Sequence, residues 1–374
     1  DARQPRTLSE LARNDAALGD SYAPVGYYQN LAIRGFPLDL ATGYRMNELA
    51  LVGEQPIALE DKERVEVLKG LGGLEAGVVS PGGLVNYVSK RPAEVRRATL
   101  GSDSHGSRYL ALDLGTWLTP AFGLRLNAAH EGTHAFVEHA DGNRNFLALA
   151  ADWKPGADAT LRFDGNYQAS SQRSVSGYQL LGGTTLPRRV DVRRMLGFQA
   201  WQRPVGVDAA NLTLRYDQRL AETWALELAA GHSRAVIDDN VAFAYGCFYA
   251  PACADGDAPG WFFAPDGDYD IYDFRSPDDT RVNDEARAVL KGAFDTGALT
   301  HELVLGATAF RRTIDSRPYV YDYVGTGNIH DAAPPLFAPS PAEPGPSVRR
   351  LTSWQRAVFA LDRIHLGDTW QLLA

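Results

Sequence analysis

The stretch DKERVEVLKGLGGLEAGVVSPGGLVNYVSKRP, residues 61–92, decides how the N-terminal part of this chain folds. Two short runs rich in valine and leucine, Val65–Leu68 and Leu84–Val88, predict strands, and six glycines lie beside or between them. The glycines do not complete the phosphate-binding spacing G-x-G-x-x-G, because Glu75 stands at the third position, and no Gly-Lys-Ser/Thr follows. They therefore indicate tight turns with positive φ angles rather than a nucleotide site.

Composition limits the classes of function. The chain has 374 residues, a formal net charge of −9 and 45% hydrophobic residues. Its acidity argues against a nucleic-acid surface, and no run approaches the roughly 20 apolar residues of a membrane helix. A membrane protein that crosses with strands has the same composition, because only every second residue of a strand meets lipid. No catalytic triad, paired carboxylates or metal-ligand spacing of histidines stands out, so we expect neither an enzyme nor a resident metal.

The sequence pattern changes after Pro92 to alternating segments of about ten residues. In Ala159–Gln168, Leu161 and Phe163 fall on one face, while Thr160 and the other polar residues fall on the opposite face. Leu212 and Leu214 alternate with polar residues in the same way. We expect these four apolar side chains to face lipid and the polar ones to face the inside of a barrel.

The connections between these segments are short and long in turn. Turns such as 119–123, 155–158 and 220–223 are brief, whereas 171–209, 237–281 and 314–348 are long and rich in Gly, Pro and Asp. Short turns at one end and long loops at the other are typical of an outer-membrane barrel. We expect about ten strands after position 95, with another beginning at Thr369.

Three motifs in order resemble one protein family: Ile33-Arg34-Gly35-Phe36, then 63–70 (ERVEVLKG), then 80–92 (SPGGLVNYVSKRP). They resemble the plug domain of TonB-dependent outer-membrane receptors, in the ferric-siderophore branch. The resemblance implies a mainly β fold, a transmembrane antiparallel β-barrel with an N-terminal α+β plug domain in its lumen. Residues 1–92 would form the plug, with its first part before residue 1. Residues 93–374 would form the N-terminal half of the barrel, truncated to about ten of an expected 22 strands.

The same resemblance implies the function. Such a receptor carries an iron(III)-siderophore complex through the outer membrane into the periplasm by active transport, and it has no cofactor of its own. Its expected partners are the TonB-ExbB-ExbD energy-coupling complex, the iron-siderophore ligand, outer-membrane lipid and lipopolysaccharide, with no nucleic acid. The bacterial outer membrane is the expected location. Two alternatives stay open: a receptor for another scarce nutrient, such as haem, cobalamin or a glycan, and a soluble β-rich binding or carbohydrate-active protein.

Two sets of site residues follow from alignment with the family motifs. The loops at the plug apex, which would touch the ligand, contain Tyr22, Tyr27, Tyr28, Glu54, Gln55 and Glu75. Because carboxylates repel an anionic catecholate complex, Glu54 and Glu75 favour a neutral or cationic hydroxamate-type chelate. The plug–barrel boundary would contain Arg34, Glu63, Arg64, Lys69 and Lys90. These are expected to pair with lumen groups such as Arg125, Glu131, Arg162 and Asp164, because such pairs hold a boundary that must also rearrange.

Cys247 and Cys253 are the two cysteines of the chain, separated by five residues in a segment expected to be a long loop. In an exported protein they would be oxidised to a local disulfide. A free or metal-binding pair is the alternative.

Overall fold

The computed structural model describes residues 8–12, 15–22, 25–70, 80–250, 253, 260–367 and 369–374. Within its N-terminal region, residues 8–92, the described residues form one short helix and two small sheets. The helix is α1 (Leu8–Ala12), and the strands are β1 (Leu18–Asp20), β2 (Leu31–Ile33), β3 (Phe36–Pro37), β4 (Tyr44–Met46), β5 (Leu49–Ala50), β6 (Lys62–Lys69) and β7 (Gly83–Ser89). One sheet has the strand order β1-β2-β3 and the other has β5-β4-β7-β6.

The rest of the described chain forms one large sheet. Its strands are β8 (Val95–Ser102), β9 (Arg108–Thr119), β10 (Phe122–Thr133), β11 (Gly142–Gly156), β12 (Ala159–Gln172), β13 (Val205–Arg219), β14 (Trp224–Ala244), β15 (Asp268–Thr296), β16 (Leu299–Ser316), β17 (Val320–Asn328), β18 (Val348–Leu366) and β19 (Trp370–Leu373). Neighbouring strands pair antiparallel in the order β19-β18-β16-β15-β14-β13-β12-β11-β10-β9-β8, and β17 adds to β15. Among the described residues no helix is long and apolar enough to cross a membrane.

The opening stretch folds into the antiparallel pair β6 and β7, with Val65 opposite Tyr87. Both predicted strands are confirmed, each a residue or more longer than expected. Gly83 begins β7 at φ 122°, and a Cβ there would lie 1.8 Å from the carbonyl oxygen of Leu68. This position therefore needs glycine. One face of β7 packs in the core of the N-terminal region, where Val85 and Tyr87 are fully buried.

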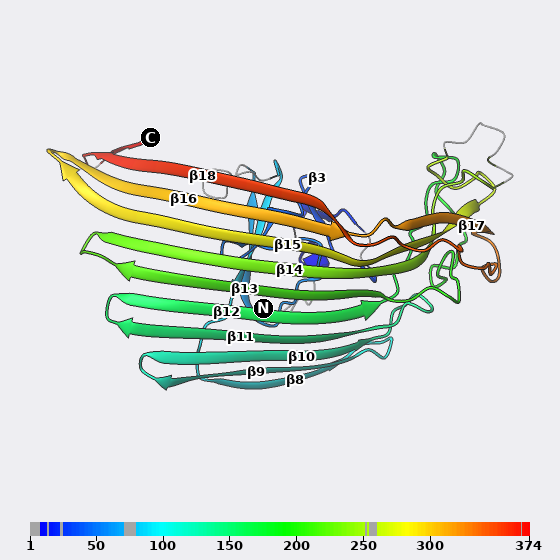
Figure 1. Cartoon of the computed structure of the whole chain (residues 1–374), viewed down its shortest axis with the longest axis horizontal. Helices are drawn as coiled ribbons and strands as arrows, with labels where there is room; N and C mark the ends of the chain where they lie inside the picture. The colour runs from blue at the N-terminus through cyan, green and yellow to red at the C-terminus, as the bar shows by residue number, and fades with distance from the viewer. Residues whose placement is uncertain are drawn as a thin grey trace.

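The large sheet is curved, and the N-terminal region lies against one side of it (Figure 1). The connections β9–β10, β11–β12, β13–β14 and β15–β16 are short and lie at one end, the short-turn end. The connections β12–β13, β14–β15 and β17–β18 lie at the opposite end, the long-loop end. This asymmetry is confirmed, but the long segments contain more strand than expected, because β14 continues to Ala244, β15 begins at Asp268 and β17 occupies 320–328.

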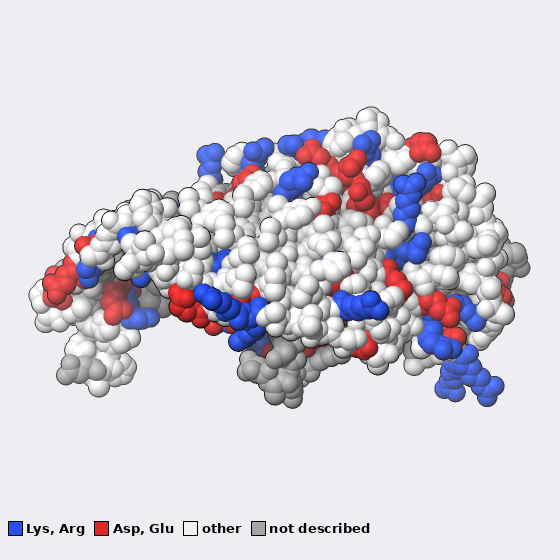
Figure 2. Space-filling model, turned by 90° about the horizontal axis from the view of Figure 1, so that it is seen from below, with Lys and Arg blue, Asp and Glu red and all other residues white. Residues whose placement is uncertain are grey.

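The two faces of the large sheet differ in polarity. On β13, Asn211 and Thr213 are buried on the face toward the N-terminal region, which we call the inner face. Leu212 and Leu214 are 44% and 45% exposed on the opposite, outer face. A soluble sheet would bury the leucines, so this reversed pattern fits a sheet whose outer face meets lipid. Figure 2 shows a broad area over the strands that is largely free of charged side chains, with acidic and basic residues along its borders.

Candidate functional site

Ion pairs join the N-terminal region to the inner face of the large sheet. Lys90 Nζ lies 3.0 Å from the Asp113 carboxylate on β9. Arg91 bridges two strands, since its guanidinium contacts Asp152 on β11 and lies 2.6 Å from Asp164 on β12. These carboxylates are almost completely buried, and a buried charge is tolerated where it is paired and hydrogen-bonded. The segment that leaves the N-terminal region is thus held to three strands.

Glu54 forms a second connection, to β15 and β16. Its carboxylate lies 2.5 Å from Arg312 and 3.2 Å from Arg281. Gln55 beside it is 2% exposed, and its amide nitrogen donates to Asn211 on β13 and to Ser233 on β14. Both side chains are engaged with the inner face and buried. The structure therefore places both side chains in contact with the sheet, and their predicted contact with a ligand stays a prediction.

The predicted boundary residues fall in several places. Of the five, Lys90 makes an ion pair with the large sheet. Arg64 pairs with Glu66 on its own strand, and Lys69 pairs with Asp15 inside the N-terminal region. Arg34 and Glu63 are exposed. Of the four predicted sheet partners, Asp164 pairs with the N-terminal region, whereas Arg125, Glu131 and Arg162 pair with carboxylates or guanidinium groups of the sheet itself.

Several contacts across this boundary were not predicted from the sequence. They involve Arg45 with Glu285, Glu48 with Arg215 and Arg287, Glu60 with Arg144, and Arg91 with its two aspartates. Arg91 stands inside the quoted motif next to Lys90, so its charge was a signal available in the sequence. Glu48 and Glu60 had none, because their partners come from strands about 80 to 240 positions away.

Three of the predicted apex residues form an aromatic cluster. The ring of Tyr22 stacks on that of Tyr28 with centroids 5.1 Å apart, and Tyr27 lies 4.6 Å from Tyr28. Burial raises the pKa of all three phenols, and the charge of Asp239 adds to this for each of them. They are therefore neutral hydrogen-bonding groups at physiological pH. Glu75 lies outside the described residues.

The tyrosine cluster continues into an aromatic wall on the inner face near the long-loop end. Tyr27 and Tyr28 pack, together with Phe243 and Phe274, on a buried cluster of valines and isoleucine from β13 and β14. Phe243 lies 5.7 Å from Tyr321, and Tyr321 stacks on Tyr272 at 4.8 Å. The aromatic wall comprises Phe243, Tyr245, Tyr249, Tyr272, Phe274, Tyr319, Tyr321 and Tyr323.

Sequence reasoning missed this wall because it assigned 237–281 and 314–348 to loops. A signal was present. Tyr319, Tyr321 and Tyr323 alternate at period two, as do Val241, Phe243 and Tyr245, and that period is typical of strands.

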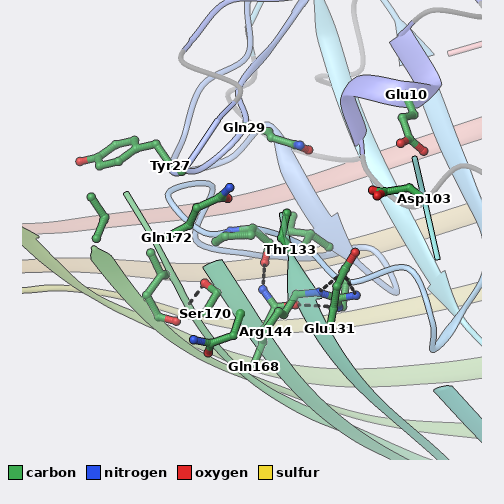
Figure 3. Close-up of a pocket in the computed structure, with 17 residues that line it drawn as sticks. Glu10, Tyr27, Gln29, Asp103, Glu131, Thr133, Arg144, Gln168, Ser170 and Gln172 are labelled. Carbon is green, nitrogen blue, oxygen red and sulfur yellow. Dashed lines mark hydrogen bonds and ion pairs between the residues drawn. The ribbon is translucent and has the colours of Figure 1, made fainter. Parts of the chain in front are cut away.

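A cavity of about 300 Å³ lies between the N-terminal region and strands β10–β13. Figure 3 shows Arg144 beside Glu131 and Gln168, with Tyr27 on one side and Glu10 and Asp103 on the other. Arg144 Nη2 lies 2.6 Å from Glu60 and 3.0 Å from Glu131, so its charge is neutralised by two carboxylates. The cavity is therefore polar, and it opens beside the tyrosine cluster.

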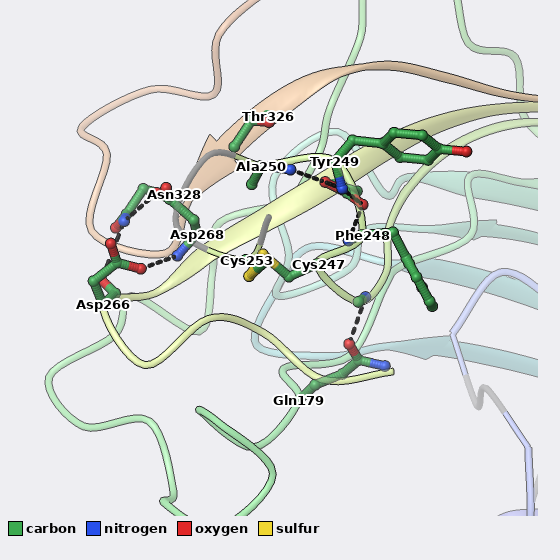
Figure 4. The surroundings of a disulfide bond; sticks show 12 residues. Gln179, Cys247, Phe248, Tyr249, Ala250, Cys253, Asp266, Asp268, Thr326 and Asn328 are labelled. Atoms are coloured by element: carbon green, nitrogen blue, oxygen red, sulfur yellow. Dashed lines mark hydrogen bonds between the residues drawn. A yellow bond between two sulfur atoms is a disulfide. The ribbon is translucent and has the colours of Figure 1, made fainter. Parts of the chain in front are cut away.

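The two cysteines are joined by a disulfide in the β14–β15 loop (Figure 4). A buried carboxylate supports the same loop: Asp270 accepts backbone N–H groups from Phe248, Tyr249 and Ala250. Tyr249 then stacks on Tyr323 at 4.7 Å. The disulfide and Asp270 together place a loop aromatic side chain at the end of the aromatic wall. Among the described residues no group of three or more His, Cys, Asp or Glu side chains is arranged to hold a metal ion.

Several known receptors resemble this chain in sequence or in fold. No protein-family model matches the chain. The metal-pseudopaline receptor of Pseudomonas aeruginosa is 31% identical over 279 residues, which cover 70% of this chain and 36% of that receptor. The ferrichrome receptor of Yersinia enterocolitica is 24% identical over 327 residues, which cover 84% of this chain and 40% of that receptor. The fold matches the ferric preacinetobactin receptor of Acinetobacter baumannii with a TM-score of 0.81 and 23% identity, covering 97% of this chain and 53% of that one.

The chain is homologous to TonB-dependent siderophore receptors. It spans about a third to a half of the length of the curated relatives it matches. These receptors are outer-membrane proteins of Gram-negative bacteria, and they are transport proteins rather than enzymes. The outer membrane is accordingly the location of this chain, which agrees with the apolar outer face of its large sheet.

Proposed function

We propose that this protein takes up a metal chelate through the outer membrane, with energy supplied by the TonB-ExbB-ExbD complex. In this proposal the N-terminal region is the plug and the large sheet is part of the barrel wall. The observation that carries it is the position of the N-terminal region on the inner face, bound by buried ion pairs below an aromatic wall. In this proposal the contacts rearrange before a solute passes, and the TonB-ExbB-ExbD complex supplies the energy for that step.

For the ligand we propose an iron(III)-siderophore that is neutral or cationic, with a hydroxamate-type chelate favoured. Phenol rings offer apolar faces and hydroxyl donors to the rim of such a complex. The charges beside the tyrosine cluster are the carboxylates of Glu54, Asp239 and Asp279 and the guanidinium groups of Arg281 and Arg312. Their sum is negative, which disfavours an anionic catecholate. Glu54 is bound to both arginines, so this argument rests on the whole group rather than on Glu54 alone.

The relationship to a metal-pseudopaline receptor favours a second candidate, a metal-pseudopaline complex. The two candidates differ in chelate chemistry, and binding measurements with both distinguish them.

Replacing Tyr22 and Tyr321 together with alanine tests the ligand site. We expect affinity for the ferric hydroxamate to fall about tenfold, or about 1.4 kcal/mol, because two stacking surfaces are lost. Tyr167→Ala is the matched control, since Tyr167 is exposed on the outer face where its hydroxyl donates to Asp208. Intrinsic-fluorescence titration with a ferric hydroxamate, a ferric catecholate and a metal-pseudopaline complex measures the affinities. Unchanged affinity for every chelate in the double variant contradicts the site, and uptake of radioactive iron that persists in cells without TonB contradicts the energy source.

A further inference from the structure

A carboxylate stands among apolar side chains behind the tyrosine cluster. Asp239 lies on the inner face of β14, two positions after Ile237 and two before Val241. Both neighbours belong to the buried cluster of valines and isoleucine on which Tyr27 packs. Asp239 itself is 6% exposed. Burial of an ionisable group among apolar side chains is unfavourable, so packing alone would favour an apolar residue at this position. Asp239 is therefore a candidate for binding rather than for structure.

Asp239 has only some of the partners that a buried carboxylate needs. It accepts a hydrogen bond from the hydroxyl of Tyr27, whereas its Oδ1 atom is buried without a partner. In the part of the chain that the structure describes, no basic side chain lies within ion-pair distance of it. The cation that faces it is Arg281, which is already bound to Asp279 at 3.1 Å and to Glu54 at 3.2 Å. Because buried charges are normally paired, Asp239 lacks the cation that would complete it.

The second acidic residue at this place is Asp279 on β15. It lies in register with Ile237, two positions from Asp239, and its charge acts on Asp239. One oxygen of Asp279 pairs with Arg281, but its Oδ1 atom is also buried without a hydrogen-bond partner. The two carboxylates thus face one guanidinium group, whose charge is shared with Glu54. The site therefore attracts a further positive charge.

Aromatic rings and a cavity lie beside these carboxylates. The ring of Tyr27 lies 4.6 Å from that of Tyr28 and 5.5 Å from that of Tyr22, between centroids. Tyr22 is 49% exposed, so a solute can reach the tyrosine cluster from its side. Tyr27 also borders the cavity of about 300 Å³ (Figure 3). A carboxylate next to aromatic rings binds an organic ammonium group well, by an ion pair and by cation–π attraction.

The height of Asp239 follows from strand geometry. Trp224 and Phe294 stack on each other at the short-turn end, with ring centroids 6.5 Å apart. From Trp224 to Asp239 the fifteen steps along β14 cover about 50 Å at about 3.3 Å per residue. With the strand tilt of about 40° usual in such barrels this is about 38 Å of height, against about 25 Å for the apolar band. Asp239 therefore lies beyond the apolar band on the long-loop side.

We propose that Asp239 binds a primary ammonium group carried by the transported chelate, and that this contact selects cationic hydroxamate complexes over neutral ones. The inference rests on the proposed function and names the residue that recognises the charge. The ammonium group donates to the free Oδ1 atom of Asp239, while its charge faces the rings of Tyr22 and Tyr27. A bare metal ion fits less well, because the described residues hold no group of three or more ligands arranged for one.

The test compares two iron complexes that differ by one charge. The first is a linear ferric trihydroxamate that ends in a free primary amine, and the second is the same complex with that amine acetylated. The receptor is expressed as its full natural chain and purified in detergent, and intrinsic-fluorescence titration measures both affinities. We expect the unchanged protein to bind the amine complex at least about tenfold more tightly, or about 1.4 kcal/mol.

Three variants assign this preference. Asp239→Asn should bind the amine complex about tenfold more weakly and the acetylated complex as tightly as before, which also shows that the variant is folded. Asp239→Glu keeps the charge and should retain most of the preference. Asp284→Asn is the matched control, because Asp284 is an aspartate of β15 that pairs with His232 and is 42% exposed at the side chain. Its preference should equal that of the unchanged protein.

A pH profile gives a readout that a purely structural role would not. Burial raises the pKa of Asp239 to about 6, against the hydrogen bond from Tyr27, and the charge of Asp279 adds to the rise. Affinity for the amine complex should therefore decrease as the pH falls from 7.5 to 5, and neither the Asp239→Asn variant nor the acetylated complex should show this decrease. The groups that face Asp239 or its tyrosines are Tyr22, Tyr27, Tyr28, Glu54, Asp279 and Arg281.

The outcomes separate this inference from the proposed function. Equal affinity of the unchanged protein for the two complexes overturns the role of Asp239 and leaves hydroxamate uptake standing. A preference that persists in Asp239→Asn overturns it as well. If neither complex binds to the unchanged protein, the hydroxamate ligand itself is wrong, and the role of Asp239 falls with it.

Discussion

Charged residues at and near the boundary between the N-terminal region and the large sheet contribute unequally to stability. Glu54 and Arg312 are each 7% exposed at the side chain and lie 2.5 Å apart, whereas Arg64 and Glu66 are 59% and 44% exposed. Desolvation is costly for the first pair and negligible for the second. A buried charge that loses its partner is therefore much more destabilising than an exposed one.

Glu54→Gln should accordingly destabilise the attachment of the N-terminal region by about 3 to 5 kcal/mol, because Arg312 stays buried without its counter-charge. Arg64→Gln, its exposed counterpart, should cost no more than about 1 kcal/mol. Denaturant titration followed by limited proteolysis of the N-terminal region measures both. Equal protease resistance of the two variants would show that the pair of Glu54 and Arg312 does not hold the region in place.

At the scale of elements, each strand of the large sheet carries two opposite environments. On β12, Phe163 points to the outer face in register with Leu214, while Thr160 lies on the inner-face side, in register with Asp217. Through Leu214 on the intervening strand β13, Phe163 is in register with Ala230 on β14, the sixth residue after Trp224. The same substitution on two faces of one strand therefore meets lipid at one position and polar side chains at the other.

An arginine at Phe163 should destabilise the protein by about 2 to 4 kcal/mol, because it places a charge near the middle of the apolar band. An arginine at Thr160 should be nearly neutral, since the side chain meets Asp217 and other polar groups. Reversible unfolding in lipid vesicles gives both values. Similar costs at the two positions would mean that the two faces are wrongly assigned.

The β14–β15 loop depends on two kinds of restraint, the disulfide and the carboxylate of Asp270. With both cysteines replaced by serine, the protein should still assemble, because the loop lies beyond the paired strands and Asp270 still accepts three backbone N–H groups. Unmodified protein should resist a thiol-reactive label until it is reduced. Ready labelling without reductant, or failure of the double-serine variant to reach the membrane, would contradict this prediction.

For the whole molecule, stability depends on the contacts that join the N-terminal region to the large sheet. Glu60 in the N-terminal region accepts from Arg144 on β11 at 2.6 Å and from the hydroxyl of Tyr109 on β9 at 3.0 Å. Burial opposes ionisation of Glu60, but the hydrogen bonds and charge of Arg144 more than offset it, so the pKa of Glu60 falls below its usual 4.5. The ionised form therefore stabilises the folded state.

Because the pKa of Glu60 is lower in the folded protein than in the unfolded chain, its contribution is complete above pH 4.5 and disappears as the pH falls through the folded-state pKa. We expect the melting temperature of the unchanged protein to decrease more steeply below pH 4.5 than that of the Glu60→Gln variant. The variant should be less stable than the unchanged protein at pH 7. If the melting temperatures of the two proteins fall in parallel below pH 4.5, ionised Glu60 does not stabilise the folded state.

The sequence by itself determined the local features of this protein. Alternation at period two assigned strands and their faces, as in Leu212 and Leu214, because side-chain direction along a strand follows from position alone. Glycines beside Val65–Leu68 indicated tight turns, and connection lengths indicated which end carries the loops. The ordered motifs from Ile33 to Pro92 indicated the receptor family.

Only the tertiary structure decided which charges meet. Lys90 and Lys69 look alike in the sequence, yet one binds the large sheet and the other binds Asp15, because curvature and register bring some strands against the N-terminal region and leave others away from it. The same holds for Glu54, whose partners on β15 and β16 are more than 220 positions away. Pairing across such separations depends on the packing of whole layers, which no short pattern in the sequence encodes.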